Sequence, residues 1–136
     1  MTKILIIDDD PDFVLAVGMT LEAHGFEVSQ AATAEEGIEK VLSIEPDLVI
    51  LDVMMPMGLE GFEVARKIRE EHNYTDLPIV MLTSIHDTRR VSYRFAPDET
   101  YLPVDVFLDK PVTPEALVET INELLGERRE EPQYPL

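Results

Sequence analysis

The feature that most constrains the fold is a short apolar run that recurs four times along the chain. The runs contain many β-branched residues and show little alternation between apolar and polar positions; they are Ile4–Ile7, Leu48–Leu51, Ile79–Leu82 and Val106–Leu108. Such runs are typical of strands that are buried on both faces of a parallel sheet. Because parallel strands need crossover connections, the pattern predicts an α/β fold with helices on both faces of the sheet.

The segments between the runs carry helical periodicity and recognisable end signals. The first predicted helix begins after Asp10 with Pro11 and ends at Gly25, and its apolar face holds Val14, Val17 and Leu21. Phe26–Gln30 then predicts a weaker edge strand. The second predicted helix begins at the capping box Thr33–Glu36 and ends before Pro46. Its side chains that are predicted to face the sheet are Ile38, Val41 and Leu42. Two further helices are predicted over Gly61–His72 and from Thr113 to Gly126.

Length and charge limit the classes of function. The chain has 136 residues, which predicts one domain, placed over residues 1–126. Residues 127–136 are polar and include Pro132 and Pro135, which predicts a flexible tail. With 11 Lys and Arg against 28 Asp and Glu, the net charge of −17 would repel nucleic acid and anionic membrane surfaces. There is no cysteine and no apolar run as long as a membrane span, so we expect a cytoplasmic protein.

Polar side chains follow the apolar runs at the point where each predicted strand ends. They are Asp8 and Asp9 after the first run, then Asp52, Thr83 and Lys110. Ligands of open parallel sheets bind beyond the carboxyl ends of the strands, so these side chains are expected to converge. Clustered carboxylates repel one another unless a cation or a proton compensates their charge, and Mg²⁺ is a cation that prefers oxygen ligands. A carboxylate, a metal, a hydroxyl and an ammonium together form a site for phosphoryl chemistry.

Each of these residues also has an ordinary structural explanation. Asp10 before a proline is typical of a helix cap. Asp52 could be a polar strand end, and Lys110 could simply offset the neighbouring Asp109. Together, however, these residues stand at the ends of four strands of one predicted sheet. Such an arrangement would rarely arise by chance, which favours the functional interpretation.

The motifs at these strand ends resemble those of a known family, the receiver domain of two-component response regulators. The matching segments, in order, are Ile7–Asp10, Asp47–Pro56, Met81–Ser84 and Phe107–Pro111, within a similarity from Lys3 to Leu125. The resemblance implies a doubly wound, five-stranded parallel sheet of flavodoxin-like order 2-1-3-4-5. It also implies a signalling domain and not an enzyme, although such a domain assists its own aspartyl phosphorylation and dephosphorylation.

The resemblance also implies a role for each site residue. Asp52 would be the phosphoacceptor, and Thr83 and Lys110 would bind phosphoryl oxygens. Asp9, Asp52 and the main-chain carbonyl of Met54 would bind Mg²⁺, with Asp8 acting through water; Thr83 and Phe107 would form the switch. The implied donor is a histidine kinase or a histidine phosphotransfer protein, and further implied partners are a downstream protein and, after phosphorylation, a second copy of the chain.

Two segments depart from the family pattern. Pro56–Gly61 is one residue longer than usual, which alters the loop beside Asp52. The segment between Thr83 and Lys110 is also longer, and its Pro97 and Pro103 predict a shortened fourth helix followed by a long loop before the fifth strand.

Other functions fit the sequence less well. A phosphohydrolase with an aspartate nucleophile would need a second acid at the position of Met54. A flavin-binding protein of the same fold would need glycines and hydroxyls where Asp8–Asp10 stand, because these carboxylates would repel a phosphate. The alternative that remains open is a degenerate receiver that acts as a phosphorylation-independent interaction module.

Overall fold

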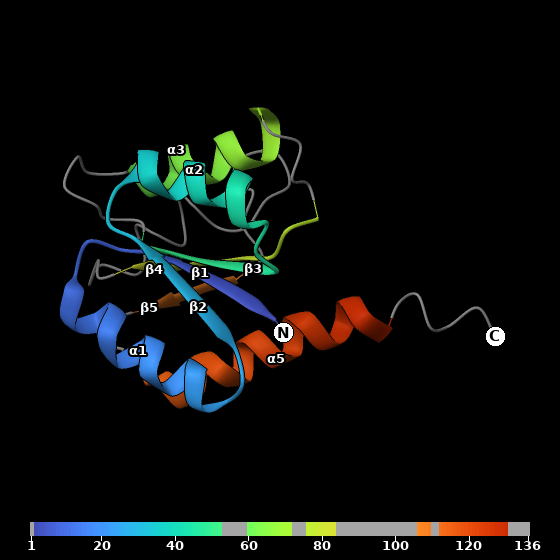
Figure 1. Cartoon of the computed structure of the whole chain (residues 1–136). Coiled ribbons are helices and arrows are strands. Elements are labelled where there is room, and N and C mark those ends of the chain that lie inside the picture. Colours follow the sequence, from blue (N-terminus) through green and yellow to red (C-terminus); the bar gives the residue numbers. More distant parts are fainter. Residues whose placement is uncertain (1, 53–59, 72–75, 84–105, 110–111, 131–136) are drawn as a thin grey trace.

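The structure is a computed structural model that describes residues 2–52, 60–71, 76–83, 106–109 and 112–130. Within them, one five-stranded parallel sheet has the order β2-β1-β3-β4-β5 (Figure 1). Its strands are β1 (Lys3–Ile7), β2 (Glu27–Ala31), β3 (Leu48–Asp52), β4 (Ile79–Thr83) and β5 (Val106–Asp109). The predicted α/β class, the edge position of the second strand and the order 2-1-3-4-5 are confirmed.

Strand register brings the carboxyl ends of the strands to one edge of the sheet. Ile7, the last residue of β1, pairs with Ala31 of β2 on one side and with Leu51 of β3 on the other. Asp52 pairs with Leu82 of β4. Polar residues that follow these positions therefore lie along a single edge.

Helices cover both faces of the sheet (Figure 1). On one face pack α2 (Ala34–Ile44), α3 (Glu60–Arg66) and the π-helical turn η1 (Lys67–Glu71). On the other face pack α1 (Pro11–Ala23) and α5 (Pro114–Glu130). Along β1, Leu5 and Ile7 belong to the first apolar cluster, whereas Ile4 and Ile6 belong to the second. This burial on both faces explains why the strand sequences do not alternate with polar residues.

The predicted helix starts are confirmed by their capping contacts. Asp10 Oδ1 accepts hydrogen bonds from the backbone N–H groups of Asp12 at 3.1 Å and Phe13 at 3.2 Å. Thr33 Oγ1 accepts one from the N–H of Glu36 at 3.1 Å. Gly25 follows α1 with a φ of 90°, a conformation that glycine adopts without strain.

Three details of the helices differ from the sequence predictions. Leu42 was predicted to face inward, but its side chain is 45% exposed. Gly126 was predicted to end the last helix, but α5 continues to Glu130; the division into a domain over 1–126 and a tail over 127–136 stays a prediction. The segment predicted as one helix over Gly61–His72 forms α3 followed by η1.

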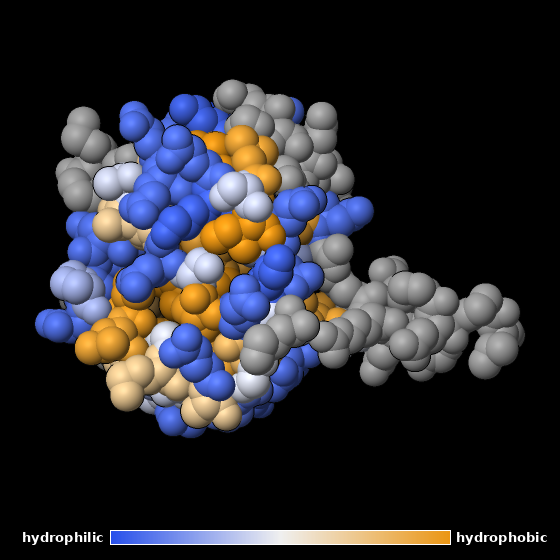
Figure 2. Space-filling view, viewed as in Figure 1, coloured by the Kyte–Doolittle hydropathy of each residue, from blue (hydrophilic) through white to orange (hydrophobic). Residues whose placement is uncertain are grey.

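Several predictions fall outside the described residues, namely the shortened fourth helix, the long loop before β5 and the last part of the tail. None of the helices in the described ranges combines the length and the apolar character needed to cross a membrane. In the hydropathy view, hydrophilic residues cover much of the visible face, and apolar residues reach the surface between the two helical layers (Figure 2).

Candidate functional site

Asp8, Asp9 and Asp52 come together at the carboxyl edge of the sheet. Asp52 is the last residue of β3, and Asp8 follows β1, the neighbouring strand. Each of the three contributes a carboxylate oxygen, and these oxygens lie within 4.8 Å of one another. Asp8 and Asp52 are buried, with 3% and 4% of their surface exposed, whereas Asp9 is exposed. The structure thus brings together the three acidic residues that the strand ends predict.

Backbone contacts fix Asp8 at the beginning of the turn between β1 and α1. The N–H of Asp8 donates to the carbonyl of Ala31 at 3.0 Å, which extends the pairing of β1 with β2 by one residue. Asp8 Oδ1 accepts a hydrogen bond from the N–H of Asp10 at 2.9 Å. Because Asp10 in turn caps α1, the chain direction at Asp8 is set by β2 on one side and by the helix on the other.

The acidic cluster has the donor set of a Mg²⁺ site. Three like charges close together, two of them on buried residues, are unfavourable unless a cation compensates them. Mg²⁺ binds oxygen ligands at about 2.1 Å, so ligands on opposite sides of the ion lie about 4.2 Å apart. The carboxylate oxygens of the three aspartates lie within 4.8 Å of one another, which is close to that distance. Mg²⁺ in proteins also usually keeps several of its water ligands. The three carboxylates therefore fit the ion, and Asp8, Asp9 and Asp52 are the residues that would hold it, directly or through water.

The remaining predicted site residues are placed only in part. Thr83 ends β4 and pairs in register with Asp109, the end of β5. Since Leu82 pairs with Asp52, the backbone of Thr83 lies at the same edge as the acidic cluster. Phe107 lies within β5, and for both Thr83 and Phe107 the description covers the backbone alone. Met54 and Lys110 lie outside the described residues, so their roles stay predictions.

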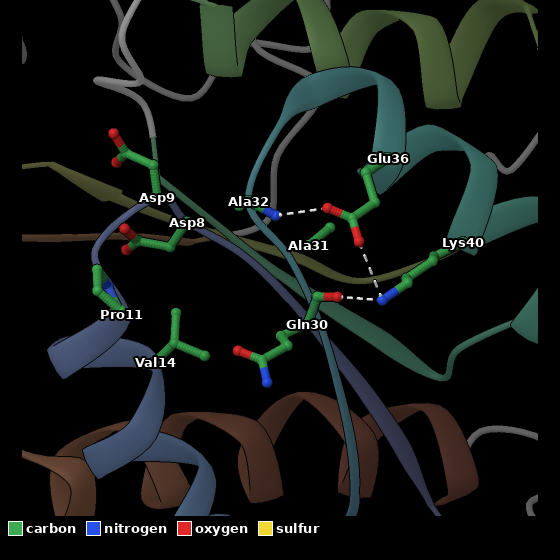
Figure 3. Close-up of a pocket in the computed structure, with 9 residues that line it drawn as sticks. All are labelled: Asp8, Asp9, Pro11, Val14, Gln30, Ala31, Ala32, Glu36 and Lys40. Carbon is green, nitrogen blue, oxygen red and sulfur yellow. Dashed lines mark hydrogen bonds and ion pairs between the residues drawn. The ribbon is translucent and has the colours of Figure 1, made fainter.

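A cavity of about 450 Å³ opens beside the acidic cluster, and its lining includes residues that the sequence analysis did not single out (Figure 3). It lies between the turn after β1, the carboxyl end of β2 and the first turns of α2. Its lining residues are Asp8, Asp9, Pro11, Val14, Gln30, Ala31, Ala32, Glu36 and Lys40. The spacing of Glu36 and Lys40, four residues apart on a predicted helix, is a sequence signal for an ion pair at this position.

Glu36 and Lys40 join α2 to the end of β2. Glu36 Oε1 accepts a hydrogen bond from the N–H of Ala32 at 3.0 Å, and Glu36 Oε2 lies 3.3 Å from Lys40 Nζ. Lys40 Nζ also donates to the carbonyl of Gln30. The N–H of Ala32, followed by the Lys40 ammonium, lowers the pKa of the Glu36 carboxyl below its ordinary value. Both side chains thus act on the strand end that holds Asp8.

Comparison with known proteins gives the family. The sequence model of the response regulator receiver domain matches residues 4–122. Protein PilH from Pseudomonas aeruginosa is 32% identical over 127 residues, which cover 93% of this chain and 99% of PilH. The DNA-binding dual master transcriptional regulator RpaA from Synechocystis is 32% identical over 133 residues, which cover 98% of this chain but only 53% of RpaA. The chain thus spans about half the length of that regulator.

Solved structures agree with this assignment. A CheY-like response regulator receiver domain protein from Methanospirillum hungatei superposes with a TM-score of 0.82 at 29% identity, covering 96% of this chain and 98% of that one. TrrA from Thermotoga maritima, solved in complex with Mg²⁺-BeF, gives a TM-score of 0.75 at 30% identity and covers 91% and 99% of the two chains. Matching family motifs, fold and acidic cluster lead to one conclusion: this chain belongs to the family of response regulator receiver domains, which are signalling domains of two-component systems.

Proposed function

We propose that this chain takes a phosphoryl group from a phosphohistidine donor onto Asp52 in a Mg²⁺-dependent reaction and thereby changes its binding to a partner. The observation that carries the proposal is the cluster of Asp8, Asp9 and Asp52 at the carboxyl edge of the sheet. Asp52 suits the acceptor role because it ends the central strand β3, flanked by β1 and β4. Its neighbours Asp8 and Asp9 suit the metal role.

The proposed reaction is a displacement at phosphorus. A carboxylate oxygen of Asp52 forms a bond to the phosphorus atom while the phosphorus–nitrogen bond of the donor breaks. The electron pair of that bond returns to the imidazole, which takes up one proton from water. When bound, Mg²⁺ neutralises charge on the phosphoryl oxygens and on the acidic cluster. Without this compensation, the carboxylates would repel the anionic donor.

The proposal includes roles for the other predicted residues. The hydroxyl of Thr83 and the ammonium of Lys110 bind phosphoryl oxygens, and the main-chain carbonyl of Met54 completes the metal ligands. Thr83 and Phe107 form the switch that transmits phosphorylation to the surface. The position of Thr83 at the end of β4, beside the strand that carries Asp52, supports its part in this arrangement.

The proposed donor is a histidine kinase or a histidine phosphotransfer protein, which also implies a cytoplasmic location. Phosphorylation is proposed to change binding to a downstream protein or to a second copy of the chain. No nucleic acid or membrane is proposed as a partner, because the net charge of −17 would repel both.

The decisive experiment is intact-mass measurement after incubation with acetyl phosphate and Mg²⁺. We expect the mass of one phosphoryl group to be added to the wild-type chain. EDTA should abolish the addition, because without Mg²⁺ the acidic cluster repels the anionic donor.

The matched control is Asp52→Asn, which removes the proposed nucleophile and preserves the size of the side chain. This variant should remain unmodified under the same conditions. Addition of the group to Asp52→Asn would show that another residue is the acceptor. A wild-type chain that stays unmodified would instead leave the phosphorylation-independent interaction module as the better description.

A further inference from the structure

We infer that Glu36 and Lys40 are positioning residues for the acidic cluster: they hold the carboxyl end of β2, which in turn holds Asp8. The inference rests on the proposed Mg²⁺ site and extends it to residues on α2 that contact neither Asp52 nor the proposed phosphoryl group. It is carried by a series of contacts, namely hydrogen bonds from α2 to Gln30 and Ala32 and one from Asp8 to Ala31, the residue between them in the backbone.

The first step of the series is a clamp on both sides of Ala31. Glu36 accepts from the N–H of Ala32 at 3.0 Å, and Lys40 donates to the carbonyl of Gln30. The two side chains are joined by their own ion pair at 3.3 Å (Figure 3). Ala31 therefore lies between two backbone groups that are both attached to α2.

The second step is the geometry of an edge strand. β2 is the first strand of the sheet and pairs only with β1 among the described strands. The backbone groups of alternate residues in a strand point to opposite sides, so Ala31 bonds toward β1 while Gln30 and Ala32 point to the outer edge. Glu36 and Lys40 supply there the partners that a further strand would otherwise provide.

The third step leads from Ala31 to the metal site. The carbonyl of Ala31 accepts the hydrogen bond from Asp8 N–H at 3.0 Å. Displacement of Ala31 would therefore move the backbone of Asp8, and with it a carboxylate whose oxygen lies within 4.8 Å of those of Asp9 and Asp52. Groups that orient metal ligands commonly affect metal affinity without touching the ion.

The exposure of Glu36 and Lys40 indicates that they position the strand end and contribute little to the overall stability of the fold. The side chains of Lys40 and Glu36 are 33% and 44% exposed, and ion pairs with such exposure contribute little to folding. The clamp also forms a wall of the cavity that reaches Asp8 and Asp9. Its removal is thus expected to loosen the strand end locally and to leave the core intact.

The test is a calorimetric Mg²⁺ titration of the double variant Glu36→Met/Lys40→Met, which removes both the acceptor for Ala32 N–H and the donor to Gln30. One acid and one base are removed together, so the net charge stays at −17 and long-range attraction of the cation does not change. We expect Mg²⁺ affinity to fall by about three- to tenfold, at or below the lower end of the effect of losing an outer-shell partner. Lys40→Arg, which keeps a cation and donors at this position, should bind Mg²⁺ as the wild type does.

A matched control removes a different exposed ion pair. Glu63→Met/Arg66→Met on α3 breaks a pair of 3.0 Å that is not part of the cavity. Its Mg²⁺ affinity should equal that of the wild type. As a second measurement, deuterium exchange of the Asp8 amide should accelerate in the Glu36/Lys40 variant and stay unchanged in the control.

The outcomes separate this inference from the proposed function. Equal Mg²⁺ affinity in the wild type and the Glu36/Lys40 variant, or unchanged exchange at Asp8, would overturn the inference and leave the Mg²⁺ site standing. A wild-type chain that binds no Mg²⁺ would overturn the proposed function and the inference together.

Discussion

Asp52 combines burial with the proximity of two other acids, and we expect this combination to destabilise the fold when no metal is bound. The residue is 4% exposed, and its carboxylate oxygen lies within 4.8 Å of oxygens of Asp8 and Asp9. Asp52→Asn removes one of these like charges with little change in shape. Without metal, we expect the variant to be more stable by about 1–2 kcal/mol, a rise in melting temperature of roughly 3–6 °C.

Thermal unfolding in EDTA and in Mg²⁺ checks this expectation. Mg²⁺ should raise the melting temperature of the wild type more than that of Asp52→Asn, because the variant has lost a ligand. A melting temperature that is unchanged or lower for the metal-free variant would show that the charges of the cluster are already compensated within the protein.

Gly37 allows α2 to approach β1 directly before the acidic cluster. A Cβ atom added at Gly37 would lie 2.6 Å from Cδ1, 3.0 Å from Cγ1 and 3.1 Å from Cγ2 of Ile7, a residue with 0% exposure. Gly37→Ala must therefore displace Ile7 or the helix. We expect a loss of about 1–3 kcal/mol in the free energy of unfolding, measured by urea denaturation.

Gly18 provides the matched control for that substitution. A Cβ atom added there would lie 3.7 Å from Val28 Cγ1, which is an ordinary contact. Since alanine is favoured over glycine in a helix interior by up to about 1 kcal/mol, Gly18→Ala should be neutral or stabilising. Equal destabilisation by both substitutions would mean that the close approach at Gly37 is not what limits its replacement.

At the scale of the element, the N-terminus of α2 should make stability depend on pH. The Ala32 N–H and the Lys40 ammonium lower the pKa of Glu36 in the folded chain. Its contribution is therefore present above the pKa of the unfolded state, near about 4.3, and is lost as pH falls through the lower folded value. The melting temperature of the wild type should exceed that of Glu36→Gln at neutral pH, and the difference should shrink below about pH 4.

Glu36→Gln is informative here because its amide oxygen can still accept the hydrogen bond from Ala32. The difference between the two proteins then reports the charge of the carboxylate. A difference that stays constant from pH 7 to pH 3 would contradict the assignment of the stabilisation to that charge.

Most of the elements could be predicted from the sequence because buried parallel strands leave an unmistakable pattern. The apolar run Ile79–Leu82 is one residue shorter than β4, since the backbone pairing continues through Thr83. The acidic cluster could be predicted for the same reason: parallel strands end together. In both cases the local sequence carries the information.

The details that could not be predicted depend on how the helices pack against the sheet. Leu42 is exposed because α2 presents Gly37 and Val41 to the sheet, a narrow stripe that the close approach at Gly37 dictates. Gly126 lies within α5 and, unlike Gly25, has no positive φ, so glycine alone does not mark a helix end. The link from Glu36 and Lys40 to Asp8 depends on the placement of α2 beside the edge of β2, which no local pattern reveals.

At the scale of the whole molecule, the net charge of −17 should make stability depend on ionic strength. Raising NaCl from about 0.01 M to about 0.1 M shortens the screening length from roughly 30 Å to roughly 10 Å, which reduces repulsion across the domain. We expect the melting temperature to rise by about 3 °C. Tetramethylammonium chloride should have the same effect, whereas a rise specific to NaCl would indicate sodium binding at the acidic cluster.

The contacts at the outer edge of β2 also bear on aggregation. Exposed strand edges are templates for pairing with strands of other molecules, and such pairing leads to aggregates. In this chain the carbonyl of Gln30 and the N–H of Ala32 are already bonded to Lys40 and Glu36. An incoming strand would have to displace both side chains to pair along the full length of β2. The edge that remains open to intermolecular pairing is therefore shorter than the strand itself.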